Sequence, residues 1–348
     1  MINAKLHKYV DDLEVAKKYL VTEFADDYRE GELKRRDLLE RVFRITGSVA
    51  ASAGALLALG IKPIYADPMA SSAGAPPRQT PGSSPLYVAP GDPAVVAGPI
   101  TFRGADGADV MAYWARPAAA GRYPVVMIAH ENRGTGPHYE DVARRYAKNG
   151  YVGLVIDQLS RQGGTAAVPP NEIGGLISGP AAVAQYVGDF QSAMAFLRQQ
   201  PFVDPNRIGM TGFCFGGGIT YSLVAVEPSL RTAVPYYGPV MDASGLRNAR
   251  AAVFGVYGAN DTFVNPSIPN VEAALSEARV PFRTMQYAGA GHAFYNDTNP
   301  MSYNEAAALA AWRDTLAWFA TYLRGGGLPA TGDGTLPVEE IAEGAAAE

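Results

Sequence analysis

The residues best suited to chemistry surround Cys214, the single cysteine of this 348-residue chain. It lies in Gly212-Phe213-Cys214-Phe215-Gly216, a nucleophile-elbow pattern with cysteine in place of serine. Such an elbow turns a strand sharply into a helix, and its two glycines keep side chains out of the crowded turn. The amino end of the helix favours the thiolate, which is the reactive form of cysteine. Cys214 is therefore a candidate nucleophile, and the alternative is a small buried hydrophobic residue.

Two further candidates follow later apolar runs of the chain. Asp261 comes shortly after residues 252–257, and His292 comes shortly after residues 282–287. The order nucleophile, acid, histidine is that of the triad in an α/β hydrolase. Asp261 would accept the Nδ1 proton of His292, which would pair with the thiolate and later protonate the leaving group. Each residue alone could be an ordinary loop residue, but the joint pattern predicts a catalytic triad.

A fourth candidate element is the segment His130-Glu131-Asn132-Arg133-Gly134, which follows the apolar run 125–129. In an α/β hydrolase, this loop donates a backbone N–H to the oxyanion hole, together with the residue after the nucleophile. The expected donors are therefore Asn132 and Phe215. The next histidine is His138, so the HExxH spacing of a zinc site is absent. Neither a metal nor a cofactor is predicted, because phosphate-binding and dinucleotide-binding glycine motifs are also missing.

An alternation of strands and helices must position these residues. A hairpin is expected from the runs 100–102 and 110–114, which flank a Gly-Ala-Asp-Gly turn. Continuous apolar runs predict strands buried on both faces. The expected strands are 125–129, 151–156, 208–213, 232–236, 252–257 and 282–287, and the expected helices are 138–148, 180–198, 267–279 and 303–323. This order predicts an α/β-hydrolase fold, with a mostly parallel central sheet covered by helices on both faces.

Composition and charge limit the class of protein. Hydrophobic residues make up 48% of the chain and charged residues 18%, as in soluble globular proteins. The net charge of −5 argues against a nucleic-acid partner, because such a partner requires a basic surface. We expect a linker rich in Pro, Gly, Ser and Ala at 67–94, a catalytic domain at 95–324 and a flexible tail at 325–348.

Residues 1–66 have the features of a leader. The pair Arg35-Arg36 precedes an uncharged run at 45–61 that is rich in Ala, Gly, Ser and Leu. Paired arginines before a modest apolar run resemble a twin-arginine export signal, here with an unusually long amino-terminal part. Export to the periplasm or another extracytoplasmic compartment is predicted. The alternatives are membrane association through residues 45–61, which are short for a span, and a buried Ala-rich helix.

As a set, the four motifs resemble the dienelactone hydrolase family (carboxymethylenebutenolidases) over about residues 95–324, and the leader is similar to that of the exported branch. The resemblance implies a cofactor-free hydrolase of a small ester or lactone, with Cys214 forming an acyl thioester. It also implies that Glu131 influences the protonation of the thiol. Arg161 would bind a substrate carboxylate.

One position departs from the family. A second arginine is expected four residues after His292, where this chain has Asn296. Two guanidinium groups can clamp a carboxylate in a way that an amide cannot, so dienelactone itself is in doubt as the substrate. Two other functions use the same residues. One is a thioesterase or peptidase with the same triad, and the other is a non-catalytic scaffold that binds a ligand or partner.

Overall fold

The computed structural model describes residues 21–22, 24–25, 28–29, 34–46, 49–61, 84–177, 180–240 and 242–325. The chain divides into two compact units, residues 1–78 and 79–348. Most of the expected linker, at 67–83, and the expected tail beyond residue 325 lie outside the described residues. The proposed domain boundaries therefore stay predictions.

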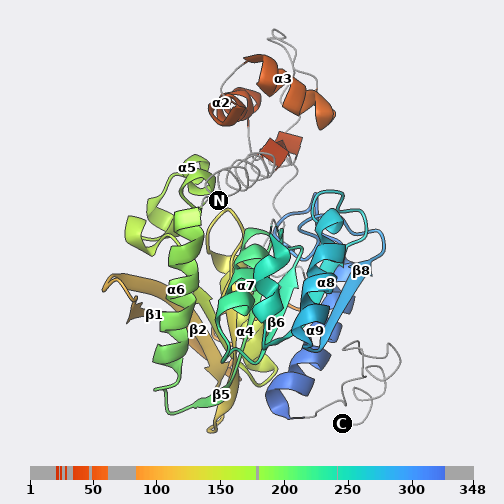
Figure 1. Cartoon of the computed structure of the whole chain (residues 1–348). Coiled ribbons are helices and arrows are strands. Elements are labelled where there is room, and N and C mark those ends of the chain that lie inside the picture. Colours follow the sequence, from red (N-terminus) through yellow and green to blue (C-terminus); the bar gives the residue numbers. More distant parts are fainter. Residues whose placement is uncertain are drawn as a thin grey trace. The chain divides into compact units, whose positions relative to one another are not determined.

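Among the described residues of the first unit are the helices α2 (Arg35–Thr46) and α3 (Val49–Ala58) (Figure 1). Its small hydrophobic core includes Leu38 and Val42 of α2 and Leu56 of α3. None of the described helices combines the length and the apolar character that a membrane span requires. The expected membrane association through residues 45–61 thus gains no support from these helices, and export stays a prediction.

The second unit alternates strands and helices along the chain (Figure 1). Its strands are β1 (Val95–Arg103), β2 (Asp109–Pro117), β3 (Tyr123–Ala129), β4 (Val152–Ile156), β5 (Val203–Phe213), β6 (Thr232–Tyr236), β7 (Ala252–Gly258) and β8 (Phe282–Tyr287). Its α-helices are α4 (Pro137–Lys148), α5 (Pro170–Ile177), α6 (Pro180–Leu197), α7 (Phe215–Val226), α8 (Ile268–Ala278) and α9 (Glu305–Arg324). Short 3-10 helices are η1 (Ser160–Gln162), η2 (Thr165–Ala167), η3 (Ala243–Asn248) and η4 (Asn265–Ser267).

The described strands form one eight-stranded sheet in the order β1-β2-β4-β3-β5-β6-β7-β8. β1 pairs with β2, and β2 with β4, in antiparallel fashion. All the remaining pairs are parallel. The carboxyl ends of the parallel strands therefore meet at one edge of the sheet, which is where α/β proteins build their sites.

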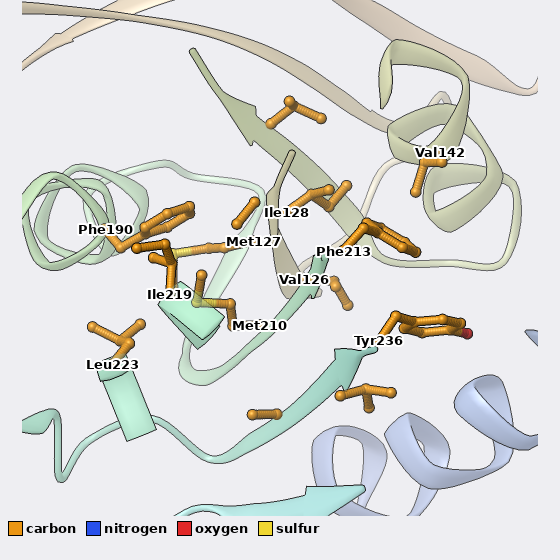
Figure 2. Close-up of a cluster of buried hydrophobic side chains, with 14 of the residues drawn as sticks. Val126, Met127, Ile128, Val142, Phe190, Met210, Phe213, Ile219, Leu223 and Tyr236 are labelled. Carbon is orange, nitrogen blue, oxygen red and sulfur yellow. The ribbon is translucent and has the colours of Figure 1, made fainter. Parts of the chain in front are cut away.

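Helices cover both faces of this sheet, which explains why its central strands are apolar throughout. On one face, α4 and α9 pack together, with the ring centroids of Tyr146 and Trp312 4.7 Å apart. Helices α6, α7 and α8 cover the other face (Figure 1). Figure 2 shows Met127 of β3 and Met210 of β5 beside Phe190 of α6 and Ile219 of α7. The sequence-based prediction of an α/β-hydrolase fold is confirmed.

Most predicted elements agree with the structure to within two residues. The two hairpin strands extend beyond the predicted runs 100–102 and 110–114, since β1 begins five residues earlier and β2 ends three residues later. Two elements elsewhere in the unit also differ. The strand leading to the elbow begins at Val203, five residues before the predicted start, because Val203 pairs with Tyr123 across a register shift. The residues between Val203 and Ile208 are not apolar, so a prediction based on continuous apolar runs places the start of this strand too late. Helix α5 was not predicted, since its eight residues include two adjacent glycines.

Candidate active site

Cys214 lies at the turn between β5 and α7, as the elbow pattern predicts. Its φ of 52° and ψ of −118° place it in a strained region for a non-glycine residue. The flanking glycines are required by close packing. A Cβ on Gly212 would lie 2.1 Å from the carbonyl oxygen of Gly216, and a Cβ on Gly216 would lie 2.3 Å from that of Ala129. The backbone of the turn is anchored by the N–H of Cys214, which donates to the carbonyl of Tyr236 at 3.1 Å.

The loops after β7 and β8 bring the predicted acid and histidine together. Nδ1 of His292 donates to Oδ2 of Asp261 at 2.6 Å. Asp261 is buried, and its other oxygen accepts the backbone N–H groups of Phe263 and Val264. The two loops are also joined by their backbones, since the N–H of Asn260 donates to a carbonyl of the second loop at 2.8 Å. This bonding fixes both the carboxylate and the ring.

The sulfur of Cys214 completes the arrangement. Burial alone would lower the pKa of His292, but the charge of Asp261, the charge of Cys214 and hydrogen bonds to both outweigh burial. The pKa of His292 is consequently raised well above its ordinary value. Burial would raise the pKa of Asp261, but His292 and two backbone N–H groups hold it below its ordinary value. Such an environment favours imidazolium beside thiolate and carboxylate.

The predicted oxyanion loop lies against the elbow. β3 pairs with β5, and its last residue, Ala129, is opposite Gly212. The backbone of residues 129–130 approaches so closely that a Cβ on Gly216 would collide with it. Phe215 is the first residue of α7, and the first N–H groups of a helix have no carbonyl partner within it. The structure therefore brings the backbone of Asn132 and that of Phe215 to the same edge as Cys214.

Glu131 is buried beside this cluster, and its carboxylate is held by two donors. The hydroxyl of Tyr237 donates to Oε1 at 3.1 Å, and the amide of Asn296 donates to Oε2 at 2.9 Å. The ring of Tyr237 also packs on His292, with centroids 5.1 Å apart. Asn296, which stands where the resemblance calls for an arginine, thus contacts Glu131.

Arg161 lies in η1 and is bound by two carboxylates. Its guanidinium donates two hydrogen bonds to Asp106 and two to Asp189, at 2.8–2.9 Å. Asp189 is buried, so this pairing fixes η1 to α6. Binding of a substrate carboxylate by Arg161 stays a prediction, and it would require the guanidinium to leave one of these partners.

Comparisons with known proteins assign the chain to a family. The model of the family described as "Dienelactone hydrolase family" matches residues 110–323. The chain belongs to the dienelactone hydrolase family. A protein of Salmonella typhimurium described as a candidate carboxymethylenebutenolidase is 34% identical over 263 residues, which cover 70% of this chain and 94% of that protein. An Escherichia coli protein with the same description is 32% identical over 264 residues, or 71% of this chain and 94% of that protein.

A solved structure agrees with this assignment to the dienelactone hydrolase family. The crystal structure described as a candidate dienelactone hydrolase from Klebsiella pneumoniae has 30% sequence identity to this chain and a TM-score of 0.60. The match covers 66% of this chain and 100% of that one. As a dienelactone hydrolase family member, the chain is a hydrolase with an α/β-hydrolase fold. In the described part of the chain, no group of three His, Cys, Asp or Glu side chains could hold a metal ion.

The site of this dienelactone hydrolase family member includes residues that the sequence analysis did not single out. Tyr237 follows β6, has a φ of 36° and connects Glu131 with the ring of His292. Tyr139 of α4 accepts the backbone N–H of Glu131 at 3.0 Å. A signal for Tyr237 was present in the sequence, because it directly follows a predicted parallel strand. Tyr139 lies inside a predicted helix and carried no comparable signal.

Proposed function

We propose that this chain is a cysteine-dependent hydrolase of small esters or lactones. The observation that carries the proposal is the convergence of Cys214, His292 and Asp261 at the carboxyl edge of the sheet, with the elbow held in a strained conformation. Family membership supports the hydrolysis, and the descriptions of the relatives as candidate carboxymethylenebutenolidases support a lactone or ester substrate.

The proposed reaction has two halves. The Cys214 thiolate attacks the substrate carbonyl carbon, and the carbonyl electrons move to an oxygen stabilised by the N–H groups of Asn132 and Phe215. The carbon–oxygen bond to the leaving group then breaks, and His292 donates its Nε2 proton to the departing alkoxide. In a lactone, that leaving group stays attached to the acyl chain.

The second half releases the acyl group from the thioester. Neutral His292 removes a proton from water, and the resulting hydroxide attacks the thioester carbon. Collapse of this second tetrahedral intermediate breaks the carbon–sulfur bond and regenerates the thiolate beside imidazolium. Asp261 keeps the Nδ1 proton in place, so that Nε2 is the atom that exchanges protons in both halves.

The test uses nitrophenyl acetate with wild type and with Cys214→Ala. We expect the wild type to release nitrophenol, and the variant to lose activity by about a thousandfold or more with its thermal unfolding unchanged. Mass spectrometry of rapidly quenched wild type should detect one acetyl group on Cys214. Full activity in the variant would refute the cysteine mechanism, and an inactive wild type with an unreactive thiol would favour a binding scaffold.

We further propose that residues 1–66 direct export through the twin-arginine route. The support is the pair Arg35-Arg36 ahead of the uncharged run 45–61. Replacing both arginines by lysine keeps the charge and should retain the protein in the cytoplasm of a bacterial host. Equal export of the wild type and the double variant, measured by fractionation, would contradict this proposal.

A further inference from the structure

The peptide plane between Glu131 and Asn132 determines where the expected oxyanion donor points. In a trans peptide, the carbonyl oxygen of one residue and the N–H of the next point in opposite directions. A bond that fixes the Glu131 carbonyl therefore also fixes the direction of the Asn132 N–H. Oxyanion donors stabilise the transition state only when they are already aimed at the developing charge.

His130 provides such a bond to the carbonyl. Its Nε2 accepts the backbone N–H of Gln158 at 3.2 Å, so Nε2 carries no proton in this arrangement. Nδ1 must then carry the proton, and it donates to the Glu131 carbonyl at 2.7 Å. The ring is fully buried, and burial lowers the pKa of His130, which keeps the imidazole neutral. Both ring nitrogens are therefore used to orient backbone.

Two other contacts act on the same stretch of backbone. The N–H of Gly134 donates to the Glu131 carbonyl at 3.2 Å, which closes the turn of the loop. The N–H of Glu131 donates to the hydroxyl of Tyr139 at 3.0 Å. The turn bond is longer than the histidine bond and belongs to the loop itself. The His130 ring connects the loop to a different strand end, since Gln158 follows β4.

We propose that His130 is a positioning residue that aims the Asn132 N–H into the oxyanion hole. Its Nδ1–H holds the Glu131 carbonyl away from the reacting carbon, and its Nε2 fixes the ring to the backbone after β4. This inference rests on the proposed function, because it concerns the same acyl transfer. It assigns no proton transfer to His130, whose ring is fully buried.

The experiment compares three variants of the full-length chain. His130→Leu removes both ring contacts. His130→Asn can keep an N–H near the position of Nδ1, whereas His130→Gln can keep an acceptor near the position of Nε2. Each variant is measured for kcat and KM with nitrophenyl acetate, for the alkylation rate of Cys214 by iodoacetamide and for thermal unfolding. Alkylation needs the thiolate but forms no oxyanion, so its rate reports on the thiolate and its His292 partner and not on the oxyanion hole.

We expect kcat to fall about tenfold to a hundredfold in the Leu and Gln variants, with KM within about twofold of wild type. The Asn variant should stay within about fivefold of the wild-type kcat, because its side chain can still donate to the carbonyl. Alkylation should be unchanged in all three. If the Leu variant fails to fold, the comparison of Asn with Gln makes the same distinction.

A second readout does not depend on turnover. Acetaldehyde adds to the thiolate through a new carbon–sulfur bond, and the carbonyl electrons move to an oxygen in the oxyanion hole. Protection of Cys214 from iodoacetamide by acetaldehyde should weaken in the Leu and Gln variants and persist in the Asn variant. Wild-type kcat in the Leu or Gln variant, or a parallel loss of kcat and alkylation, would overturn the inference. A wild type that hydrolyses no ester would instead overturn the proposed function.

Discussion

At the scale of single residues, backbone strain gathers around the reactive sulfur. Four non-glycine residues in the described part of the chain have a positive φ, and three of them belong to the site: Cys214, Tyr237 and Ala293. Strained residues of this kind persist only where the surroundings overdetermine them. Here, the backbone N–H of Cys214 is bonded to Tyr236, and that of Tyr237 is bonded to Val256 at 2.6 Å. The strain is thus held by the parallel strands β6 and β7.

The charge of His292 depends on Asp261, which gives a prediction for thiol reactivity. Because the pKa of His292 is raised, the ring stays protonated at neutral pH and keeps a cation beside the sulfur. Asp261→Asn should lower that pKa, so the thiolate loses its partner. The midpoint of the iodoacetamide rate against pH should then rise toward that of an ordinary thiol, about 8.5. Asp189→Asn removes another buried carboxylate and should leave the profile unchanged. An unshifted midpoint in Asp261→Asn would contradict the prediction.

Local sequence was sufficient to predict that Cys214, Asp261 and His292 follow strand ends, but it was insufficient for the contacts that hold them. The elbow, the acid and the histidine each follow an apolar run, and a strand end is a local feature of the sequence. The contact between Asn296 and Glu131 spans 165 residues, and it depends on where two loops meet. The pairing of Arg161 with Asp106 and Asp189 depends in the same way on the β1–β2 turn and on α6. The spacing of residues along the sequence does not show which distant segments come into contact in the fold.

At the scale of elements, the elbow requires its glycines because a strand end, a helix start and the β3 loop share one small space. Gly212→Ala would place a methyl group 2.1 Å from a backbone oxygen. We expect it to destabilise the fold by about 4 kcal/mol or more, since the obstacle is backbone that cannot rotate away. Thermal unfolding or soluble yield measures this loss.

The matched control for that prediction is Gly188→Ala in α6. Nothing lies within 4 Å of a Cβ built at Gly188. Alanine in a helix interior is favoured over glycine, so this variant should gain about 0.5–1 kcal/mol in the free energy of unfolding. Equal effects of the two substitutions would contradict the packing argument for the elbow.

A second element-scale feature is a buried ionic cluster that joins α4 to the segment following His292. Arg145 of α4 bonds to Asp141 of the same helix and to Asp297, which also bonds to His138. Burial would raise the pKa of Asp297, but the His138 hydrogen bond and the charge of Arg145 hold it well below its ordinary value. The loop that carries His292 is thereby attached to α4, the helix that follows the predicted oxyanion loop.

Because the pKa of Asp297 is lowered in the folded protein, the direction in which its contribution to stability changes with pH is defined. The contribution of Asp297 to stability is present above the ordinary pKa of an aspartate, about 3.9. It is lost as the pH falls through the lower pKa that this carboxyl has in the folded protein. Asp297→Asn should therefore cost about 3 kcal/mol at neutral pH, and the difference from wild type should shrink in strong acid. Asp92→Asn removes an exposed pair with Lys148 and should change little. Urea unfolding at several pH values tests both, and a pH-independent difference would contradict this account.

At the scale of the whole molecule, the second unit holds the elements that the family shares. Residues 79–348 contain the large hydrophobic core, and the family match, 110–323, lies within them. We expect a chain beginning at Gln79 to fold and to hydrolyse nitrophenyl acetate with kcat within about twofold of full length, since no triad residue is lost. Circular dichroism and initial rates measure this. An unfolded or inactive shortened chain would show that residues 1–78 are needed for the catalytic unit.

The presence of only one sulfhydryl in the chain, set at the turn into α7, has a practical consequence. A covalent tag specific for thiols can mark a single atom per polypeptide, and that atom is the one on which turnover is proposed to depend. Counting incorporated tag per mole of protein would therefore count accessible Cys214 thiols directly. Preparations of different quality could then be compared on a common stoichiometric scale.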